Sequence, residues 1–264
     1  MIGIFDSGIG GLTVARAVME LFPHLNICYF GDTARTPYGT KSKDTVTRYA
    51  VENTRFLLDQ GAKIIVVACN TASAVAVPTL RERFDVPIFE VISPAVDMAL
   101  SLAKAKRIGV IGTRGTINSG IYERLIKERD PERKVFSEPC PLLVSLVEEG
   151  WLKKPETRMI VKKYLHPLKA QQIQSLILGC THYPILKQLI ARKIGKRVKI
   201  VDSSEAVSVS LKRYLDDNPR VMDGLSKGGE SVFHVSDVTA QFAKTAQLIL
   251  NRRVDLQHAT PLEC

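Results

Sequence analysis

Two segments of the chain share one order of residue types, and this repeat restricts the folds that the sequence can adopt. In residues 63–72 and again in residues 175–184, a short apolar stretch leads through a small residue to a cysteine and two hydrogen-bonding side chains. A short apolar run bounded by turn formers is typical of a buried strand in a parallel sheet. We therefore expect Cys69 and Cys180 at the ends of two buried strands.

A second similarity relates the same two parts of the chain. Residues 107–116 repeat the pattern of residues 1–8, which is an Ile-Gly-aliphatic strand followed by a polar, glycine-containing turn. Gly3 and Gly109 lie 106 residues apart and the two cysteines lie 111 residues apart, so one duplication with small insertions explains both pairs.

The segments between these landmarks alternate between strand and helix patterns, which is the order expected of a parallel sheet. The predicted strands are 2–5, 26–30, 64–69, 86–92, 107–112, 175–179, 198–201 and 232–235. The predicted helices are 14–21, 44–60, a segment that ends near Lys104, 204–214 and 239–250.

The length of 264 residues exceeds the roughly 150 residues of a typical domain and favours two domains. We predict an α/β protein of two similar domains, each a mostly parallel sheet flanked by helices. A pseudo-twofold relates them, and the active site lies in the cleft between them. The first domain comprises residues 1–92 and 208–264, and the second comprises residues 93–207.

Composition excludes several classes of protein. Hydrophobic residues at 45% and charged residues at 24% are ordinary for a globular chain, and no apolar run approaches the roughly 20 residues that span a bilayer. The N-terminus lacks the pattern of a signal peptide, so we expect a cytoplasmic location and no membrane partner. The five cysteines are odd in number and form no C-x-x-C pair, which favours free thiols and predicts no metal site.

The formal charge of +10 suits either nucleic-acid binding or a solvated basic surface. No nucleic-acid motif accompanies the charge, so we do not expect a nucleic-acid partner. Gly8 and Gly10 resemble part of a dinucleotide fingerprint, but Leu12 and Thr13 follow where a third glycine is needed.

The two cysteines can perform acid/base chemistry together. Ligands of open parallel sheets bind beyond the carboxyl ends of the strands, and a thiol at a helix N-terminus is shifted toward thiolate. Two thiols that face one cleft can remove a proton from one face of a carbon and return a proton to the opposite face. An isolated cysteine at a strand end is usually a small buried apolar residue, but a matched pair reverses that preference.

Polar side chains in the surrounding loops supply the rest of such a site. Hydrogen-bond donors for developing negative charge are Ser7, Asn70, Thr71, Thr181, and Tyr38 or its neighbouring backbone amides. The ionisable groups that tune the thiols or hold a substrate ammonium are Asp6, Glu148 and His182. A cysteine hydrolase that uses Cys180 with His182 is a weaker interpretation, because residues two apart on a turn rarely face each other, and Cys69 then has no role.

Six stretches together resemble the glutamate racemases of the cofactor-independent aspartate/glutamate racemase family. They are FDSGIGGLT (5–13), YFGDTAR (29–35), PYGTK (37–41), VACNTAS (67–73), LVEEG (146–150) and LGCTHYP (178–184). The resemblance covers residues 1–205 and implies an isomerase that interconverts L- and D-glutamate without a cofactor and supplies D-glutamate for peptidoglycan.

The resemblance also implies roles for individual residues. Cys69 and Cys180 are the two proton donors and acceptors, and Glu148 assists the second thiol, although the adjacent Glu149 leaves that choice open. The residues that the resemblance places on glutamate are Asp6, Ser7, Tyr38, Gly39, Asn70, Thr71, Thr181 and His182. Members of the family differ in forming a homodimer and in activation by a cell-wall precursor, so both remain open.

Two other functions stay open at this point. Pocket chemistry does not fix pocket length, so a racemase for aspartate or another acidic amino acid is one alternative. A secondary role in binding nucleic acid or a topoisomerase is the other, because it would use the net positive charge.

Overall fold

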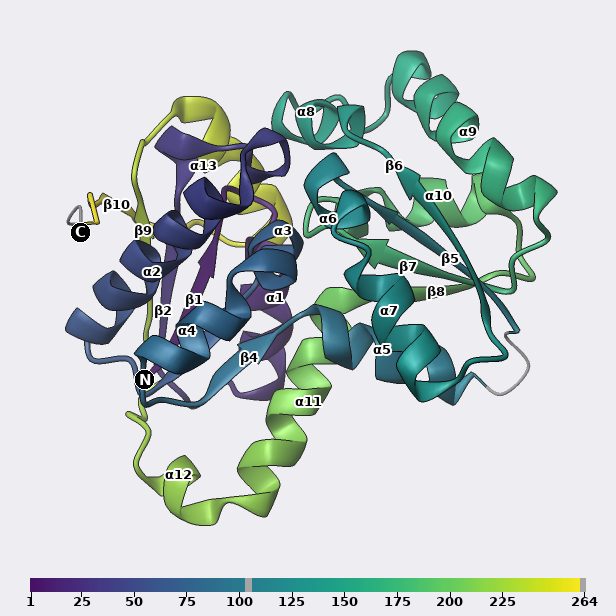
Figure 1. Cartoon of the computed structure of the whole chain (residues 1–264). Helices are drawn as coiled ribbons and strands as arrows, with labels where there is room; N and C mark the ends of the chain where they lie inside the picture. Colours follow the sequence, from purple (N-terminus) through teal and green to yellow (C-terminus); the bar gives the residue numbers. More distant parts are fainter. Residues whose placement is uncertain (103–105, 262–264) are drawn as a thin grey trace.

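The strands of the chain form two separate sheets, and all neighbouring strands within each sheet run parallel. The structure is a computed structural model that describes residues 1–102 and 106–261, and Figure 1 shows the two sheets side by side. The first sheet contains β1 (Ile2–Asp6), β2 (Ile27–Gly31), β3 (Ile64–Val67), β4 (Ile88–Glu90), β9 (Ser231–Val235) and β10 (Leu256–His258). The second contains β5 (Arg107–Gly112), β6 (Lys134–Pro139), β7 (Ser175–Gly179) and β8 (Lys199–Asp202).

The order of strands repeats between the two sheets. In the first sheet β2, β1, β3 and β4 lie side by side, with β9 and β10 added beyond β2; in the second sheet the order is β6, β5, β7 and β8. Each set reads second, first, third, fourth in chain order, so β1 corresponds to β5 and β3 to β7. This repeat is the topology that the sequence similarity between residues 1–8 and 107–116 predicts.

Helices cover both faces of both sheets. Helices α2 (Lys43–Asp59), α3 (Asn70–Val75) and α4 (Val77–Arg83) pack on the outer face of the first sheet, and α8 (Leu142–Glu148), α9 (Pro155–Ala170) and α10 (Lys187–Ile194) pack on the outer face of the second. Between the sheets lie α1 (Leu12–Leu21), α5 (Ile92–Ser101), α7 (Ile121–Arg129), α11 (Ser203–Asp217) and α13 (Ala240–Leu250). The remaining short helices are α6 (Arg114–Asn118), α12 (Pro219–Asp223), η1 (Thr33–Arg35), η2 (Tyr38–Thr40) and η3 (Tyr183–Leu186).

One hydrophobic core joins the two halves. Ile2 and Ile4 of β1 and Ile108 and Val110 of β5 belong to the same buried cluster, whereas Phe5 faces the opposite side of the first sheet. This alternation follows from the two-residue period of a strand, which sends successive side chains to opposite faces. Because the inner helices pack against both sheets, the halves form a continuous body.

The predicted fold class is confirmed, since both sheets are parallel and flanked by helices. Strand β6 was not predicted; its residues are half-buried or exposed at the edge of the second sheet, so they lack a continuous apolar run. The helix predicted to end near Lys104 is α5, which ends at Ser101, and residues 103–105 lie outside the described residues. The domain boundaries after residues 92 and 207 remain a prediction. No helix in the described ranges combines the length and the apolar character needed to cross a membrane.

Candidate active site

The carboxyl ends of the central strands gather the polar residues that the sequence indicated. Asp6 ends β1 and Ser7 follows it, and Cys69 lies two residues beyond β3, the neighbour of β1. In the second sheet Thr113 follows β5 and Cys180 follows β7. These strands are equivalent in the two sheets, and each pair lies where the strand order reverses, which is where open α/β sheets bind ligands.

Residues from both halves enclose a cavity of about 20 Å³. Its lining consists of Ser7, Pro37, Tyr38, Gly39, Cys69, Asn70, Thr71, Thr113, Val144, Cys180, Thr181 and His182. This lining contains no Lys or Arg, so anionic oxygens of a ligand must be bound by hydroxyl, amide and imidazole groups. The volume suits about one water molecule, which is less than an amino acid occupies.

The first thiol is held in its protonated form. Cys69 caps the N-terminus of α3, is 5% exposed, and places its Sγ 3.7 Å from the Ser7 Oγ. Burial and, to a smaller extent, the nearby Asp6 carboxylate raise the pKa of Cys69 to about 12, although the Ala72 amide and the Ser7 hydroxyl oppose the rise. A net shift of this thiol toward thiolate, expected at a helix N-terminus, is therefore not found, because desolvation outweighs the hydrogen bond from the Ala72 amide in α3.

The second thiol lies beside a cationic imidazole. The Cys180 Sγ is 3.7 Å from the His182 Nδ1, and the His182 Nε2 is 3.1 Å from the Glu148 Oε1. Burial alone would lower the pKa of His182, but its hydrogen bonds with Cys180 and Glu148 raise that pKa to about 10. His182 is therefore protonated at neutral pH, and its imidazolium can donate a hydrogen bond to the Cys180 Sγ. A short 3₁₀ helix, η3, follows Cys180 and begins at Tyr183.

Asp6 connects the two halves. One of its carboxylate oxygens accepts the Thr181 hydroxyl at 3.2 Å and the other accepts the Gly8 amide at 3.0 Å. Burial raises the pKa of Asp6, and the positive charge of His182 opposes that rise. A Cβ on Gly10 would lie 2.5 Å from the His182 Nδ1, so glycine is required there for the two turns to approach. The close approach therefore accounts for Gly10, which the partial dinucleotide fingerprint left unexplained.

Asn70 presents a buried donor that has no protein partner. Its Oδ1 accepts the hydroxyl of Tyr122 at 2.7 Å, which fixes the orientation of the amide. Its Nδ2 is buried and has no hydrogen-bond partner among the described residues. Buried donors are nearly always satisfied, so an unpaired donor on the cavity lining indicates a place for a ligand oxygen. Tyr122 was missed by the sequence analysis, because nothing in its own segment points to a residue 52 positions away.

Three threonine hydroxyls join the halves beside this amide. The Thr71 Oγ1 lies 2.9 Å from that of Thr113 and 3.3 Å from that of Thr116, and the latter two are 3.1 Å apart. Thr113 and Thr116 were also missed, although the repeat contained a signal for them. Thr113 follows β5 and caps helix α6, which contains Thr116, and this segment corresponds to the one that begins with Asp6 and Ser7 after β1.

The structure also gives the positions of the other residues that the sequence predicted for the site. Glu148 faces His182, whereas Glu149 is exposed. The Tyr38 ring is buried, but its hydroxyl donates to Asp32 and accepts from the Asn53 Nδ2 at 3.0 Å, so it does not donate into the cavity. Gly39 lies on the lining, against Thr113. Two other thiols, Cys28 and Cys140, are buried and do not belong to this lining, and Cys264 lies outside the described residues.

The arrangement suits proton transfer at a carbon atom. One cavity contains a protonated thiol and a second thiol beside an imidazolium, and they come from equivalent strands of two equivalent sheets. A carbon acid placed between them could lose a proton to one sulfur and gain a proton from the other.

Comparisons with known proteins agree with this chemistry. The model of the Asp/Glu/Hydantoin racemase family matches residues 13–210. A glutamate racemase of Syntrophus aciditrophicus is 45% identical over 255 residues, which cover 95% of this chain and 93% of that protein. A glutamate racemase isoform of Bacillus anthracis has a similar structure, with a TM-score of 0.92, 36% identity, and coverage of 98% of this chain and 97% of that one. The glutamate racemase of Francisella tularensis, solved in complex with D-glutamate, gives a TM-score of 0.90 at 39% identity, with coverage of 98% and 97%.

Proposed function

The chain belongs to the Asp/Glu/hydantoin racemase family, and we propose that it moves the α-proton of glutamate between two thiols. Its reaction is the interconversion of L- and D-glutamate, which makes it an isomerase. The observation that carries the two-thiol mechanism is the opposite environment of Cys69 and Cys180 in one cavity, one sulfur beside a carboxylate and the other beside an imidazolium.

In the direction that starts from the resting state, the Cys180 thiolate removes the α-proton. The C–H bond breaks, an S–H bond forms, and the electron pair passes into the adjacent carboxylate as an enolate. The Cys69 thiol then donates its proton to the opposite face of the α-carbon, which inverts the configuration and leaves Cys69 as the thiolate. The reverse reaction uses the same steps with the roles exchanged.

The enolate-like intermediate carries extra negative charge, and hydrogen-bond donors that line the cavity stabilise this charge. The Asn70 amide, fixed by Tyr122, supplies one donor, and the hydroxyls of Ser7 and Thr71 supply others, whereas the Thr181 hydroxyl donates its proton to Asp6. Gly39 and the main chain around Tyr38 complete the binding of the carboxylates. We assign Asp6 to orienting Thr181 and to attracting the substrate ammonium.

The cellular setting follows from the same proposal. D-glutamate made by this enzyme supplies peptidoglycan synthesis, and the four buried free thiols among the described residues suit a reducing, cytoplasmic compartment. The proposal also includes a homodimer, activation by a cell-wall precursor, and a division into two domains. The first domain comprises residues 1–92 with 208–264, and the second comprises residues 93–207. Sedimentation of the purified chain tests the homodimer, and a rate assay with added precursor tests the activation.

A substrate panel tests the proposed function against its alternatives. The purified chain, without added cofactor, is given each enantiomer of glutamate, aspartate and a neutral amino acid, and the change in optical rotation is followed. We expect racemisation of glutamate well above that of aspartate. A preference for aspartate would shift the proposal to the alternative racemase, and no racemisation of any amino acid would refute it. Titration with duplex DNA at two salt concentrations tests the nucleic-acid role, because phosphate binding weakens as salt rises.

A further inference from the structure

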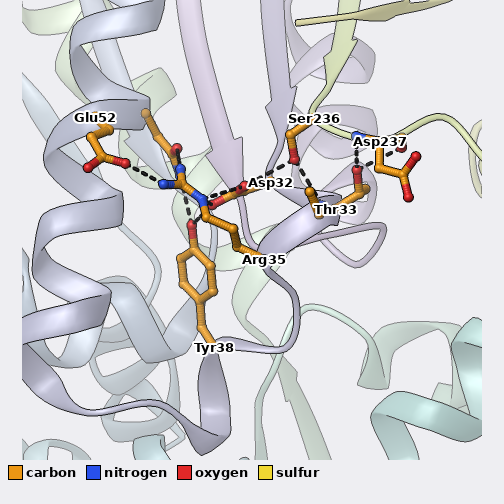
Figure 2. A network of polar contacts seen from close by, with 9 residues as sticks. Asp32, Thr33, Arg35, Tyr38, Glu52, Ser236 and Asp237 are labelled. Carbon is orange, nitrogen blue, oxygen red and sulfur yellow. Dashed lines mark hydrogen bonds and ion pairs between the residues drawn. The ribbon is translucent and has the colours of Figure 1, made fainter. Parts of the chain in front are cut away.

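A buried polar network surrounds the turn that forms one wall of the cavity. Asp32, which follows β2, is fully buried, and both of its carboxylate oxygens accept the Nε of Arg35, at 2.9 and 2.7 Å. The Ser236 hydroxyl donates to the same carboxylate at 3.0 Å, and the Tyr38 hydroxyl also donates to it. Figure 2 shows these groups converging on Asp32 from three sides.

Arg35 ties this network to helix α2. Its guanidinium pairs with Glu52, which is 3% exposed, and its Nη2 donates to the Asn53 Oδ1 at 3.1 Å. The same group lies over the ring of Tyr49, 4.0 Å from the centroid. In Figure 2 the guanidinium lies between the carboxylates of Glu52 and Asp32. A planar group with five donors in a fixed fork can satisfy all of these acceptors at once, which a lysine cannot.

The hydroxyl of Tyr38 belongs to this network and not to the cavity. It donates its one proton to Asp32 and accepts from the Asn53 Nδ2 at 3.0 Å. Burial, together with the Asp32 carboxylate, raises the pKa of Tyr38 well above its usual value, so the hydroxyl keeps the proton that it donates. The side chain of Tyr38 therefore anchors residues 36–40, hereafter the 36–40 turn, from behind.

The 36–40 turn is also tightly packed on the side that faces the second half. Pro37, Tyr38 and Gly39 line the cavity, and a Cβ on Gly39 would lie 2.5 Å from the Cβ of Thr113 in the opposite half. The turn is thus fixed between a buried network in the first half and the threonine cluster of the second. A loss of support behind it would displace the main chain that faces the substrate.

We propose that Arg35 is a positioning residue for substrate binding, which acts through Asp32 and Tyr38 to hold the 36–40 turn against Thr113. The group touches no reacting atom, so its contribution lies in the affinity for glutamate and not in proton transfer. This inference rests on the proposed function, because it assumes that the turn faces bound glutamate.

The test uses Arg35→Lys, Tyr38→Phe and the double variant. Arg35→Lys keeps a positive charge between two buried carboxylates, which avoids the cost of leaving both unpaired. Arg124→Lys is the matched control, since Arg124 forms a surface pair with Glu128 far from the network. For each protein, kcat and KM are measured with L- and D-glutamate, and thermal unfolding confirms that the assays contain folded enzyme.

We expect Arg35→Lys and Tyr38→Phe each to raise KM about tenfold for both enantiomers with kcat nearly unchanged, as expected for lost binding that is uniform along the reaction. The double variant should be no worse than Arg35→Lys alone, because both changes act on the same turn. Arg124→Lys should match the parent.

Three results would overturn the inference: an unchanged KM in folded Arg35→Lys, a fall in kcat at unchanged KM, or a double variant that is about a hundredfold weaker because the two effects multiply. The last result would mean that the Tyr38 hydroxyl acts on the substrate independently of Arg35. A parent enzyme that fails to racemise glutamate would instead refute the proposed function.

Discussion

Replacement of Glu148 by glutamine removes the negative charge beside His182, whose imidazolium contacts Cys180, and keeps a hydrogen-bond acceptor at that position. The Glu148 Oε1 is 3.1 Å from the His182 Nε2, and the Glu148 side chain is 31% exposed, so solvent screens part of the attraction. An opposite charge at this distance typically moves a pKa by one to three, and with screening we expect Glu148→Gln to lower that of His182 by about one to two. The imidazolium that supports the Cys180 thiolate would then be lost at a lower pH.

Two measurements check this prediction. NMR titration of carbon-labelled histidine reports the His182 midpoint, which should fall from about 10 in the parent enzyme to about 8 to 9 in Glu148→Gln. Because the group is active when protonated, kcat/KM should hold at neutral pH and fall as pH rises through the midpoint, so its alkaline limb should move with the variant. Glu149→Gln is the control, since Glu149 is exposed. An unmoved His182 midpoint in Glu148→Gln would refute the reasoning.

Three further outcomes follow from the site. Cys69→Ala and Cys180→Ala should each slow racemisation by about a thousandfold or more in both directions, since each removes one of two required acid/base groups; near-normal polarimetric rates in either would contradict the mechanism. Gly39→Ala should raise KM, because its Cβ would meet the Thr113 Cβ at 2.5 Å and displace the 36–40 turn; a KM equal to that of the parent would show that the turn has slack. Iodoacetamide at neutral pH should label Cys180 before Cys69, whose pKa is about 12, and mass spectrometry of the modified peptides would reveal the opposite order.

The parts of the site that could be predicted from sequence are those that adjoin their own strand. The cysteine turns after β3 and β7 were recognisable because an apolar strand and its following turn are contiguous in the chain. Their positions at the carboxyl ends of the two sheets followed from the rule for ligand binding in parallel sheets, and their meeting in one cavity followed from the predicted pseudo-twofold. The repeat of strand order extended this reasoning from one half to the other.

The parts that could not be predicted depend on distant residues. Tyr122 orients Asn70 from 52 positions away, and Arg35 reaches Glu52 only because α2 packs beside the loop that follows β2. The protonation state of Cys69 could not be predicted from the sequence either. Burial is the largest cause of its raised pKa, and the depth of burial depends on tertiary packing. Local patterns predict which groups lie near the site, whereas tertiary packing decides their charge and orientation.

The two halves differ in how they support their thiols, although their strands correspond. Cys69 has a hydroxyl and a carboxylate nearby, and Cys180 has the His182–Glu148 pair. The proposed mechanism therefore begins with the proton on the Cys69 sulfur and assigns the role of base to Cys180, the thiol beside the imidazolium.

Transfer of solvent deuterium to the α-carbon tests the two-thiol mechanism most directly. L-glutamate is incubated with the purified enzyme in heavy water without added cofactor, and both enantiomers are separated early and analysed by mass spectrometry. We predict that the D-glutamate formed carries one deuterium at the α-carbon while the recovered L-glutamate keeps its protium, because different groups remove and deliver the proton. D-glutamate that retains the substrate's own protium would contradict this account, since it would mean that a single group carries the proton from one face to the other.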